Sequence, residues 1–260
     1  MKQRMMLYFG SFNPVHRGHT ALAEYVIECG LCDCVALIVS PQSPFKQNDD
    51  LLPEFARFEM AEIACSNSKY PDEISASAVE FLLPKPSYTI DTLRFLQDNN
   101  GGDMTFSILM GADNIVNIGQ WKESEKILSD YDIYVYPRNG YDVGNMGRRV
   151  VVLEDAPLYD CTATDIRTRL RSGDDVSQML CEGVVEYIKE HKLFSAACSD
   201  GLTAQFMAEG REYYRRNEWG AALNAFRKVL KEAPDNCEAA EYVKMIEEIL
   251  SFRYTDIYNP

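Results

Sequence analysis

The fold is decided by the stretch Leu7–Thr20, which reads LYFGSFNPVHRGHT. A short apolar run ends there at a Gly-Ser turn, and two of the chain's 3 histidines, His16 and His19, follow where a helical pattern begins. Helix starts attract anions, because their first N–H groups lack partners and the helix dipole is positive at that end. The stretch therefore predicts a strand, a loop whose backbone can touch a phosphate, and two imidazoles at a helix N-terminus.

Length and composition limit the class of protein. The chain has 260 residues, 46% of them hydrophobic, which suits one large globular domain or one domain with a small addition. No apolar run approaches the ~20 residues that span a bilayer. The apolar run that follows Met1–Arg4 is too short for a secretory signal. We therefore expect a cytoplasmic protein with no membrane partner.

The charge of the chain bears on its partners. Its formal net charge of −14 argues against a nucleic-acid partner, because proteins that bind nucleic acid usually carry the opposite sign. On so acidic a chain, any phosphate site must be locally basic. The candidate cations are Arg17, Lys46, Arg57, Arg167 and Arg169.

Three of the 8 cysteines form a Cys-x-x-Cys-x-Cys pattern at Cys29, Cys32 and Cys34. The pattern lacks the second pair or the nearby histidine that a zinc site needs, and Cys34 enters a predicted strand. We therefore expect reduced thiols and predict no metal site built from protein side chains.

Short apolar runs alternate with helical patterns over residues 1–195, which predicts an α/β fold with a parallel sheet. The expected strands are Met5–Phe9, Val35–Val39, Thr105–Met110, Ile133–Tyr136 and Val150–Leu153, with a further extended segment at Ile74–Val79. The expected helices are Thr20–Cys29, Glu54–Cys65, Thr89–Asn99, Lys122–Ser129, Thr164–Arg171 and Glu182–His191. Functional loops of such sheets lie at the carboxyl ends of the strands, where Leu7–Thr20 places its glycine turn.

A second regime begins after Phe194. Ser195–Gly201 has the composition of a linker, and residues 196–260 form a predicted helical domain separate from residues 1–195. Its small and aromatic residues resemble one tetratricopeptide repeat followed by a helix over Cys237–Phe252. One repeat cannot bury its apolar face alone. We expect these helices to dock on the first domain, on a second copy of the chain or on a protein partner; a hairpin that only caps the core is the alternative.

The first motif also resembles a known signature. Gly10, Phe12, Pro14, His16, Gly18 and His19 reproduce the Gly-x-Phe-x-Pro-x-His-x-Gly-His pattern of the nucleotidyltransferase superfamily. The form found here is most similar to nicotinate and nicotinamide mononucleotide adenylyltransferases. The resemblance implies a Rossmann-like domain that transfers the adenylyl group of ATP to nicotinate mononucleotide, giving deamido-NAD and pyrophosphate in NAD biosynthesis.

A second element, Asp160–Arg167, is similar to the Ile-Ser-Ser-Thr-x-Ile-Arg element of the same family. Cys161, Thr162 and Ala163 depart from that pattern, and Ala163 lacks the family's hydroxyl. Thr164 is the expected helix N-cap. The resemblance implies catalytic roles for His16, His19 and Arg167, and implies ATP contacts from Gly10, Ser11, Phe12, His16, Gly18, His19, Thr162, Thr164 and Arg167.

Other segments resemble the family's mononucleotide pocket. The implied contacts come from Asn13, Lys46, Tyr88, Thr89, Gly111, Asp113 and Trp121. Asp113 would accept hydrogen bonds from ribose hydroxyls, and Trp121 would stack on the pyridine ring. Purely structural roles stay open as alternatives: Trp121 as a core residue, Tyr88 as a packing residue and Thr89 as a helix cap.

The implied chemistry needs no protein nucleophile, because the attacking phosphate is ionised at pH 7. His16 and His19 would donate hydrogen bonds to phosphates, and Mg²⁺ would be carried with ATP. Alternative acceptors are nicotinamide mononucleotide and pantetheine phosphate. The alternative from another class is a scaffold protein with a degenerate catalytic domain.

Overall fold

The computed structural model describes residues 2–41, 51–84, 86–100, 102–144, 146–159, 161–194 and 201–255. Its strands are β1 (Gln3–Gly10), β2 (Cys34–Val39), β3 (Ile74–Ser77), β4 (Met104–Gly111), β5 (Asp132–Tyr136) and β6 (Val150–Val152). Its helices are α1 (Arg17–Glu28), α2 (Glu54–Ser66), α3 (Thr89–Asn99), α4 (Ala112–Ile115), α5 (Ser124–Asp130), α6 (Ala163–Ser172), α7 (Glu182–Glu190), α8 (Gly201–Arg215), α9 (Trp219–Glu232) and α10 (Cys237–Thr255), with short 3₁₀ turns η1 (Val79–Leu82) and η2 (Ile118–Gln120).

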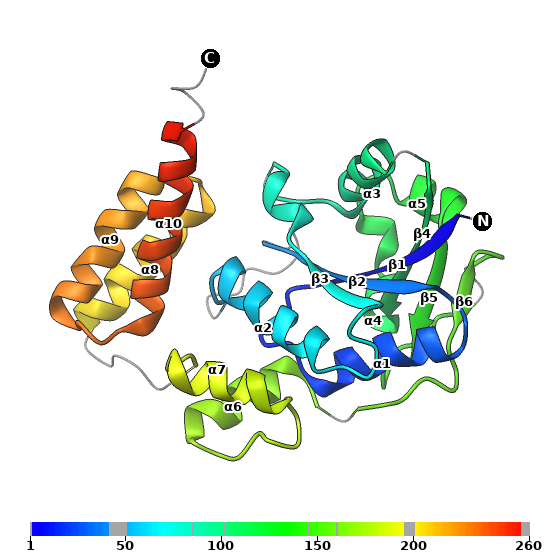
Figure 1. Cartoon of the computed structure of the whole chain (residues 1–260), viewed down its shortest axis with the longest axis horizontal. Helices are drawn as coiled ribbons and strands as arrows, with labels where there is room; N and C mark the ends of the chain where they lie inside the picture. The colour runs from blue at the N-terminus through cyan, green and yellow to red at the C-terminus, as the bar shows by residue number, and fades with distance from the viewer. Residues whose placement is uncertain are drawn as a thin grey trace.

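The strands form one parallel sheet with helices on both faces (Figure 1). The strand order is β3-β2-β1-β4-β5-β6, the doubly wound order of Rossmann-like folds. The direction of winding changes between β1 and β4, and this is where such sheets bind ligands, at the carboxyl ends of the strands. The glycine motif follows β1 and therefore lies at this switch point.

Successive side chains of the central strands point to opposite faces of the sheet, and apolar residues occupy both faces. On β1, Met6 and Tyr8 belong to the apolar cluster that packs with α1, α2, α6 and α7, whereas Leu7 belongs to the cluster that packs with α3, α4 and α5. Successive side chains of a strand point to opposite faces, so a strand covered on both sides reads as a continuous apolar run.

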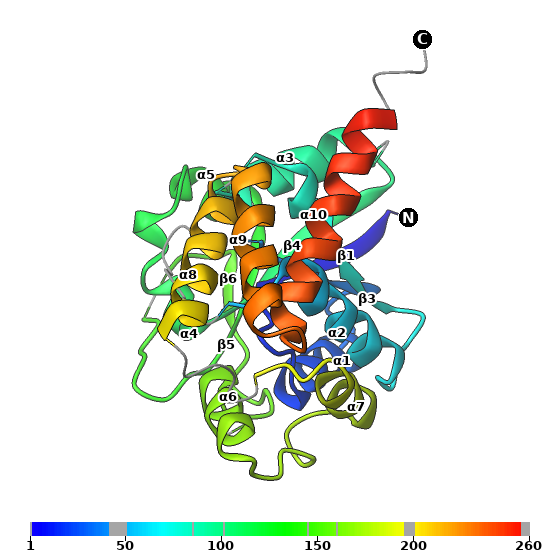
Figure 2. The ribbon, with the colours of Figure 1, turned by 90° about the vertical axis from the view of Figure 1, so that its left-hand side faces the viewer.

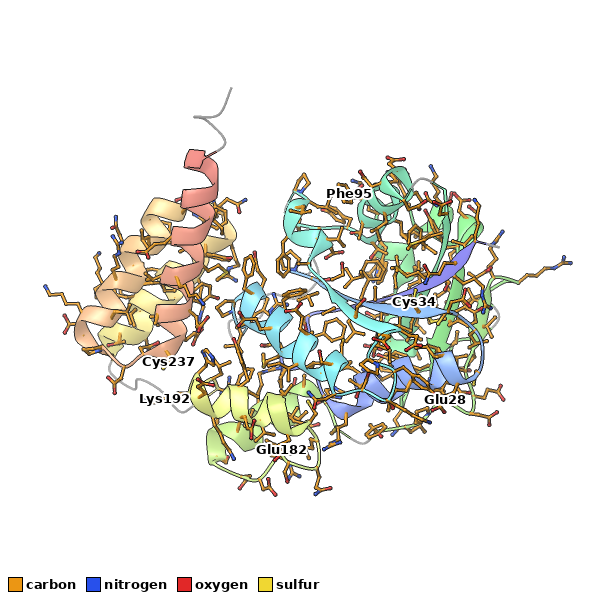
Figure 3. All side chains as sticks on the ribbon, viewed as in Figure 1. Glu28, Cys34, Phe95, Glu182, Lys192 and Cys237 are labelled. Carbon is orange, nitrogen blue, oxygen red and sulfur yellow. The ribbon has the colours of Figure 1, made fainter. Side chains whose placement is uncertain are left out.

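The last three helices, α8, α9 and α10, form a bundle beside the sheet domain (Figures 1 and 2). The bundle has an apolar cluster of its own, centred on Phe226, whose ring stacks on that of Tyr242 with centroids 4.2 Å apart. Figure 3 shows side chains packed between the three helices of the bundle. It also shows the side chains that cover the two faces of the sheet. Gly210 of α8 lies against Phe226, because a Cβ at this position would come within 2.6 Å of the ring.

The parallel α/β sheet and the helical C-terminal extension are confirmed. The start of α1 was predicted three residues too late, because His16 rather than a later residue is the N-cap. The short elements α4, η1 and η2 went unpredicted, since three or four residues show no periodicity. Residues 195–200 lie outside the described residues, so the division into domains 1–195 and 196–260 stays a prediction. Within the described ranges, no helix is long and apolar enough to cross a membrane.

The glycine at position 210 gives a test of bundle packing. We expect Gly210→Ala to destabilise the protein by about 1–3 kcal/mol, because the added methyl group displaces the Phe226 ring. Gly220→Ala in α9 is the matched control, since a Cβ there meets nothing within 4 Å. Urea unfolding monitored by circular dichroism measures both variants. Equal stability of the two variants would contradict the tight packing of α8 on α9.

Candidate active site

The loop after β1 folds back on itself through Phe12. Phe12 has a left-handed backbone with φ of +45° and is 2% exposed, and its ring makes edge contacts with Tyr8 and His19 at 5.7 and 5.0 Å. A Cβ on Gly10 would lie 2.9 Å from the Phe12 ring. Position 10 therefore requires glycine, so that the loop can bury Phe12 and turn its backbone toward the switch point.

The two histidines of the motif are joined by a hydrogen bond at the start of α1. The His16 backbone N–H donates to Nδ1 of His19 over 3.1 Å, and the two rings lie with centroids 3.7 Å apart and planes tilted by 32°. Because Nδ1 of His19 accepts this hydrogen bond, a neutral His19 carries its proton on Nε2. His19 can therefore offer an N–H donor to a ligand.

Both imidazoles are neutral at pH 7. Burial, with a smaller contribution from the positive charge of Arg138, lowers the pKa of His16 to about 4. Burial and the neighbouring His16 and Arg138 also lower the pKa of His19 well below its usual range. The two imidazoles are therefore uncharged groups, and Arg138 supplies positive charge beside them.

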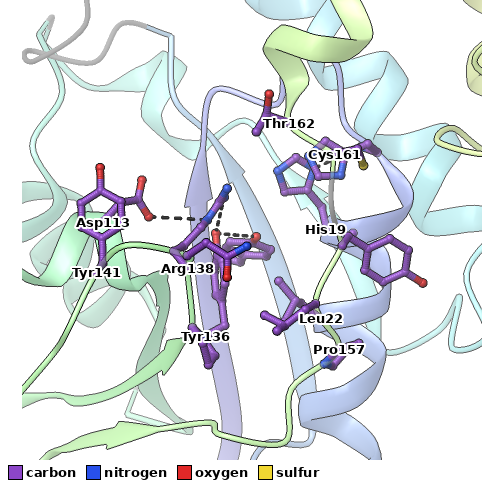
Figure 4. A pocket seen from close by; sticks show the side chains of 16 residues that line it. His19, Leu22, Asp113, Tyr136, Arg138, Tyr141, Pro157, Cys161 and Thr162 are labelled. Atoms are coloured by element: carbon purple, nitrogen blue, oxygen red, sulfur yellow. Dashed lines mark hydrogen bonds and ion pairs between the residues drawn. The ribbon is translucent and has the colours of Figure 1, made fainter.

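A cavity of about 460 Å³ opens beside these histidines (Figure 4). It is lined by Tyr8, His16, Gly18, His19, Leu22, Asp113, Tyr136, Pro137, Arg138, Asn139, Tyr141, Pro157, Leu158, Tyr159, Cys161 and Thr162. These residues come from β1 and β5, from the start of α1, from α4, from the loop after β5 and from the approach to α6, so the cavity lies where the Rossmann order places a nucleotide.

A polar network crosses the floor of the cavity. Arg138 donates to the Tyr136 hydroxyl over 3.1 Å, and its Nε lies 3.6 Å from Oδ1 of Asp113. The Tyr8 hydroxyl donates to that of Tyr136 over 3.2 Å. Gly111 lets Asp113 turn back into the cavity, because a Cβ on this glycine would lie 2.3 Å from the carboxylate oxygen. The network fixes the guanidinium of Arg138, which can neutralise an anion.

The start of α6 is tied to the motif loop. Nη1 of Arg167 donates to the Asn13 carbonyl over 2.8 Å, and Nη2 donates to the Thr164 hydroxyl over 3.2 Å. The prediction that Thr164 is the N-cap is wrong: Thr162 caps the helix, and its hydroxyl accepts from the Asp165 N–H over 3.1 Å. Asp165 completes a capping box, so its position favours the earlier threonine.

Of the predicted cations, Arg57 is not available to a phosphate. It is 0% exposed, and within the described residues its guanidinium donates to four backbone carbonyls, among them that of Ser11 over 2.6 Å. Arg17 donates to the Leu180 carbonyl over 3.0 Å and holds the approach to α7. Lys46 lies outside the described residues.

The predicted mononucleotide contacts divide into separate places. Asp113 lines the cavity with His16, whereas Tyr88 and Trp121 pack half-buried against the cluster of α3, α4 and α5. Thr89 is the first residue of α3, and the N-cap is Tyr88, so the alternative of Thr89 as a cap is wrong. The roles of these residues toward a ligand stay predictions.

Sequence reasoning missed Arg138. The signal was present, because Arg138 follows the predicted strand Ile133–Tyr136 by two residues and so falls at the same sheet edge as the glycine motif. Tyr8 and Tyr136 were hidden within strands, where an aromatic residue reads as core. In the described part of the chain, no three His, Cys, Asp or Glu side chains gather as a metal site.

Comparisons with known proteins agree with this geometry. Residues 7–169 match the cytidylyltransferase-like family. A relative from Cytophaga hutchinsonii, described as a probable nicotinate-nucleotide adenylyltransferase, is 40% identical over 192 residues, which are 97% of that protein and 73% of this chain. The chain belongs to the nicotinate-nucleotide adenylyltransferase family.

A second relative by sequence and one solved structure are also similar to the chain. A probable nicotinate-nucleotide adenylyltransferase from Bacteroides thetaiotaomicron is 37% identical over 191 residues, 93% of that protein and 73% of this chain. The Plasmodium falciparum nicotinic acid mononucleotide adenylyltransferase complexed with NaAD has a TM-score of 0.64 at 17% identity, over 74% of this chain and 97% of that one. This likeness shows a shared fold. The family match ends before α8, so the C-terminal bundle is an addition to the matched region.

The buried histidine predicts a pH dependence of stability. The pKa of His16 is about 4 in the folded chain and 6.5 by its ordinary value, so between these values the unfolded chain binds a proton that the folded chain does not. The contribution of the neutral His16 to the free energy of unfolding is therefore fully present above pH 6.5. It falls as the pH is lowered toward 4, by up to about 3 kcal/mol. Urea unfolding at several pH values should show a smaller loss in His16→Gln than in the wild type. If the free energy of unfolding changed with pH in the same way in His16→Gln and in the wild type, the burial of a neutral His16 would be contradicted.

Proposed function

We propose that the chain transfers the adenylyl group of ATP to nicotinate mononucleotide, giving deamido-NAD and pyrophosphate. The observation that carries the proposal is the convergence of His16, His19, Asp113 and Arg138 on one cavity at the switch point of a Rossmann-like sheet. Family membership supports the same acceptor, because the relatives carry the name of this activity.

The reaction joins two phosphates by direct displacement. An oxygen of the mononucleotide's 5′-phosphate forms a bond to the α-phosphorus of ATP, and the bond from that phosphorus to the pyrophosphate oxygen breaks. The attacking oxygen is already ionised, so no proton has to be removed. Catalysis then consists of holding the two phosphates in line and offsetting negative charge as the bond breaks.

The described residues divide this work between neutral and charged donors. Nε2–H of His19 and the ring of His16 would donate to phosphate oxygens, with Gly18 keeping the backbone close: a Cβ there would lie 3.0 Å from the His16 ring. Arg138 supplies full positive charge inside the cavity. Backbone groups of the loop after β1, and Thr162 at the start of α6, would contact the nucleotide, while Arg167 holds the Asn13 carbonyl and so fixes the loop.

We propose Mg²⁺ as the ion that accompanies ATP. Asp113 is the carboxylate among the described residues lining the cavity, and it is paired with Arg138. This donor set suits an ion held mainly by phosphate oxygens and water, as Mg²⁺ is in many nucleotide sites. When bound, it neutralises charge on the phosphates. Cytoplasmic location and a protein or second-copy partner for the helical extension remain predictions.

The acceptor can be tested directly by measuring pyrophosphate release with ATP and Mg²⁺. We expect kcat/KM for nicotinate mononucleotide to exceed that for nicotinamide mononucleotide and for pantetheine phosphate by at least about tenfold, or ~1.4 kcal/mol of transition-state binding. A preference for either rival would keep the chemistry and replace the substrate. If no acceptor led to pyrophosphate release, the scaffold alternative would be favoured.

The histidine pair gives a test of mechanism. We expect His19→Ala to lower kcat more than about tenfold, because the variant loses a donor to the reacting phosphates. Circular dichroism should show an unchanged fold. Thr20→Ala is the matched control, since Thr20 follows His19 on α1 but does not line the cavity. Wild-type turnover by His19→Ala would remove this histidine from the mechanism.

A further inference from the structure

The C-terminal bundle touches the sheet domain at the segment that begins α2 (Figures 1 and 2). The Tyr242 hydroxyl of α10 donates to the Leu51 carbonyl over 3.3 Å. The Tyr214 hydroxyl of α8 donates to Sδ of Met245 over 3.1 Å and lies beside the Glu54 carboxylate, whose negative charge acts on it. A second contact joins Nδ1 of His191, at the end of α7, to Oε1 of Glu241 over 2.8 Å. Polar groups thus connect the bundle to the sheet domain.

The groups at this contact are buried. Tyr242, Tyr214 and Glu54 are each 4–5% exposed, and Arg57, one turn further along α2, is 0% exposed. A buried carboxylate is costly unless hydrogen bonds and opposite charge accompany it. Glu54 has opposite charge beside it, because its carboxylate attracts the Arg57 guanidinium, and the polar Tyr214 hydroxyl is its neighbour. Docking of the bundle therefore determines the environment of the Glu54–Arg57 pair.

The same α2 segment holds the motif loop. Nη1 of Arg57 donates to the Ser11 carbonyl over 2.6 Å and to the Ser40 carbonyl over 2.8 Å. The Leu52 N–H donates to Oδ1 of Asn13 over 3.3 Å. A continuous series of hydrogen bonds and charge interactions thus runs from Tyr242 and Tyr214, through residues 51–57, to the loop that bears His16.

These interactions between the bundle and the loop depend on keeping water away from Glu54. With the bundle in place, water is kept from Glu54, and the attraction between Glu54 and Arg57 acts in a medium of low polarity. Departure of the bundle would expose Glu54 to solvent and so weaken that attraction. It would also remove the Tyr242 hydroxyl from the Leu51 carbonyl. The segment that holds Ser11 and Asn13 would then be less firmly placed.

We propose that Tyr242 and Tyr214 are positioning residues for the nucleotide, because docking of the bundle on residues 51–57 holds the loop Gly10–His16 in its ligand-binding geometry. The inference rests on the proposed function, since it takes ATP as the ligand of that loop. Coupling between two sites is reciprocal, so ATP binding must in turn tighten the docking of the bundle. The bundle is thereby linked to nucleotide affinity in addition to its contribution to stability.

The test uses full-length protein with Mg²⁺ and ATP in the absence of an acceptor. Calorimetry gives the Kd for ATP of the wild type, of Tyr242→Phe and of the double variant Tyr214→Phe/Tyr242→Phe. Each substitution removes one hydroxyl and keeps the ring, including the stack of residue 242 on Phe226. Tyr213→Phe is the matched control, because Tyr213 is a half-buried neighbour in the same cluster.

We expect the double variant to raise the Kd for ATP by about threefold to tenfold, the size of one net hydrogen bond, while Tyr213→Phe leaves it unchanged. Hydrogen exchange supplies the second readout: ATP should slow exchange in α10 of the wild type and have less effect in the double variant. A purely structural role would lower the melting temperature without changing either quantity.

The outcomes separate this inference from the proposed function. Unchanged ATP affinity and unchanged exchange in a folded double variant would overturn the positioning role and leave the proposed function intact. A wild type that binds no ATP would overturn both. If the double variant fails to fold, Tyr242→Phe alone decides, because it removes the hydrogen bond to the Leu51 carbonyl and leaves the Tyr214 hydroxyl in place.

Discussion

The guanidinium of Arg57 ties together three segments that meet at the carboxyl ends of β1 and β2. It donates to carbonyls of the loop after β1, of the end of β2 and of the approach to α2. Those carbonyls would otherwise be buried without partners, at a cost of roughly 1–3 kcal/mol each. The turn that exposes the motif's backbone, the start of α1 with its two histidines and the docking surface for the bundle all depend on this one side chain.

The electrostatics of the cavity follow from burial. A polyanion that entered the cavity would meet two uncharged imidazoles and one fixed guanidinium, held by Tyr136 and Asp113. Neutral histidines retain hydrogen-bond donors without repelling Arg138, and the charge of Arg138 itself helps to keep them neutral. A strongly acidic chain thus presents a local site in which positive charge comes from arginine alone among the described lining residues.

Much of this arrangement could be predicted from the sequence, because its signals are local. Continuous apolar runs gave the strands, and the glycine motif gave the binding edge of the sheet. The role of Arg57 could not be predicted, since its partners lie up to 46 residues away in the chain and only the fold brings their carbonyls together. The cap at Thr162 was misplaced because two threonines two residues apart fit the same pattern, and Asp165 decides between them. Arg138 could have been predicted, because it follows the predicted strand Ile133–Tyr136 at the same sheet edge as the glycine motif.

The polar seam between the bundle and the sheet domain has a consequence for the chain's behaviour in solution. Among the described side chains, each of the three apolar clusters lies wholly on one side of this seam. Separation would therefore uncover the Tyr242 hydroxyl, the Glu54 carboxylate and the Leu51 carbonyl while each apolar cluster kept its own members. The bundle and the sheet domain thus each have a complete apolar core, and the side-chain contacts described between them are polar.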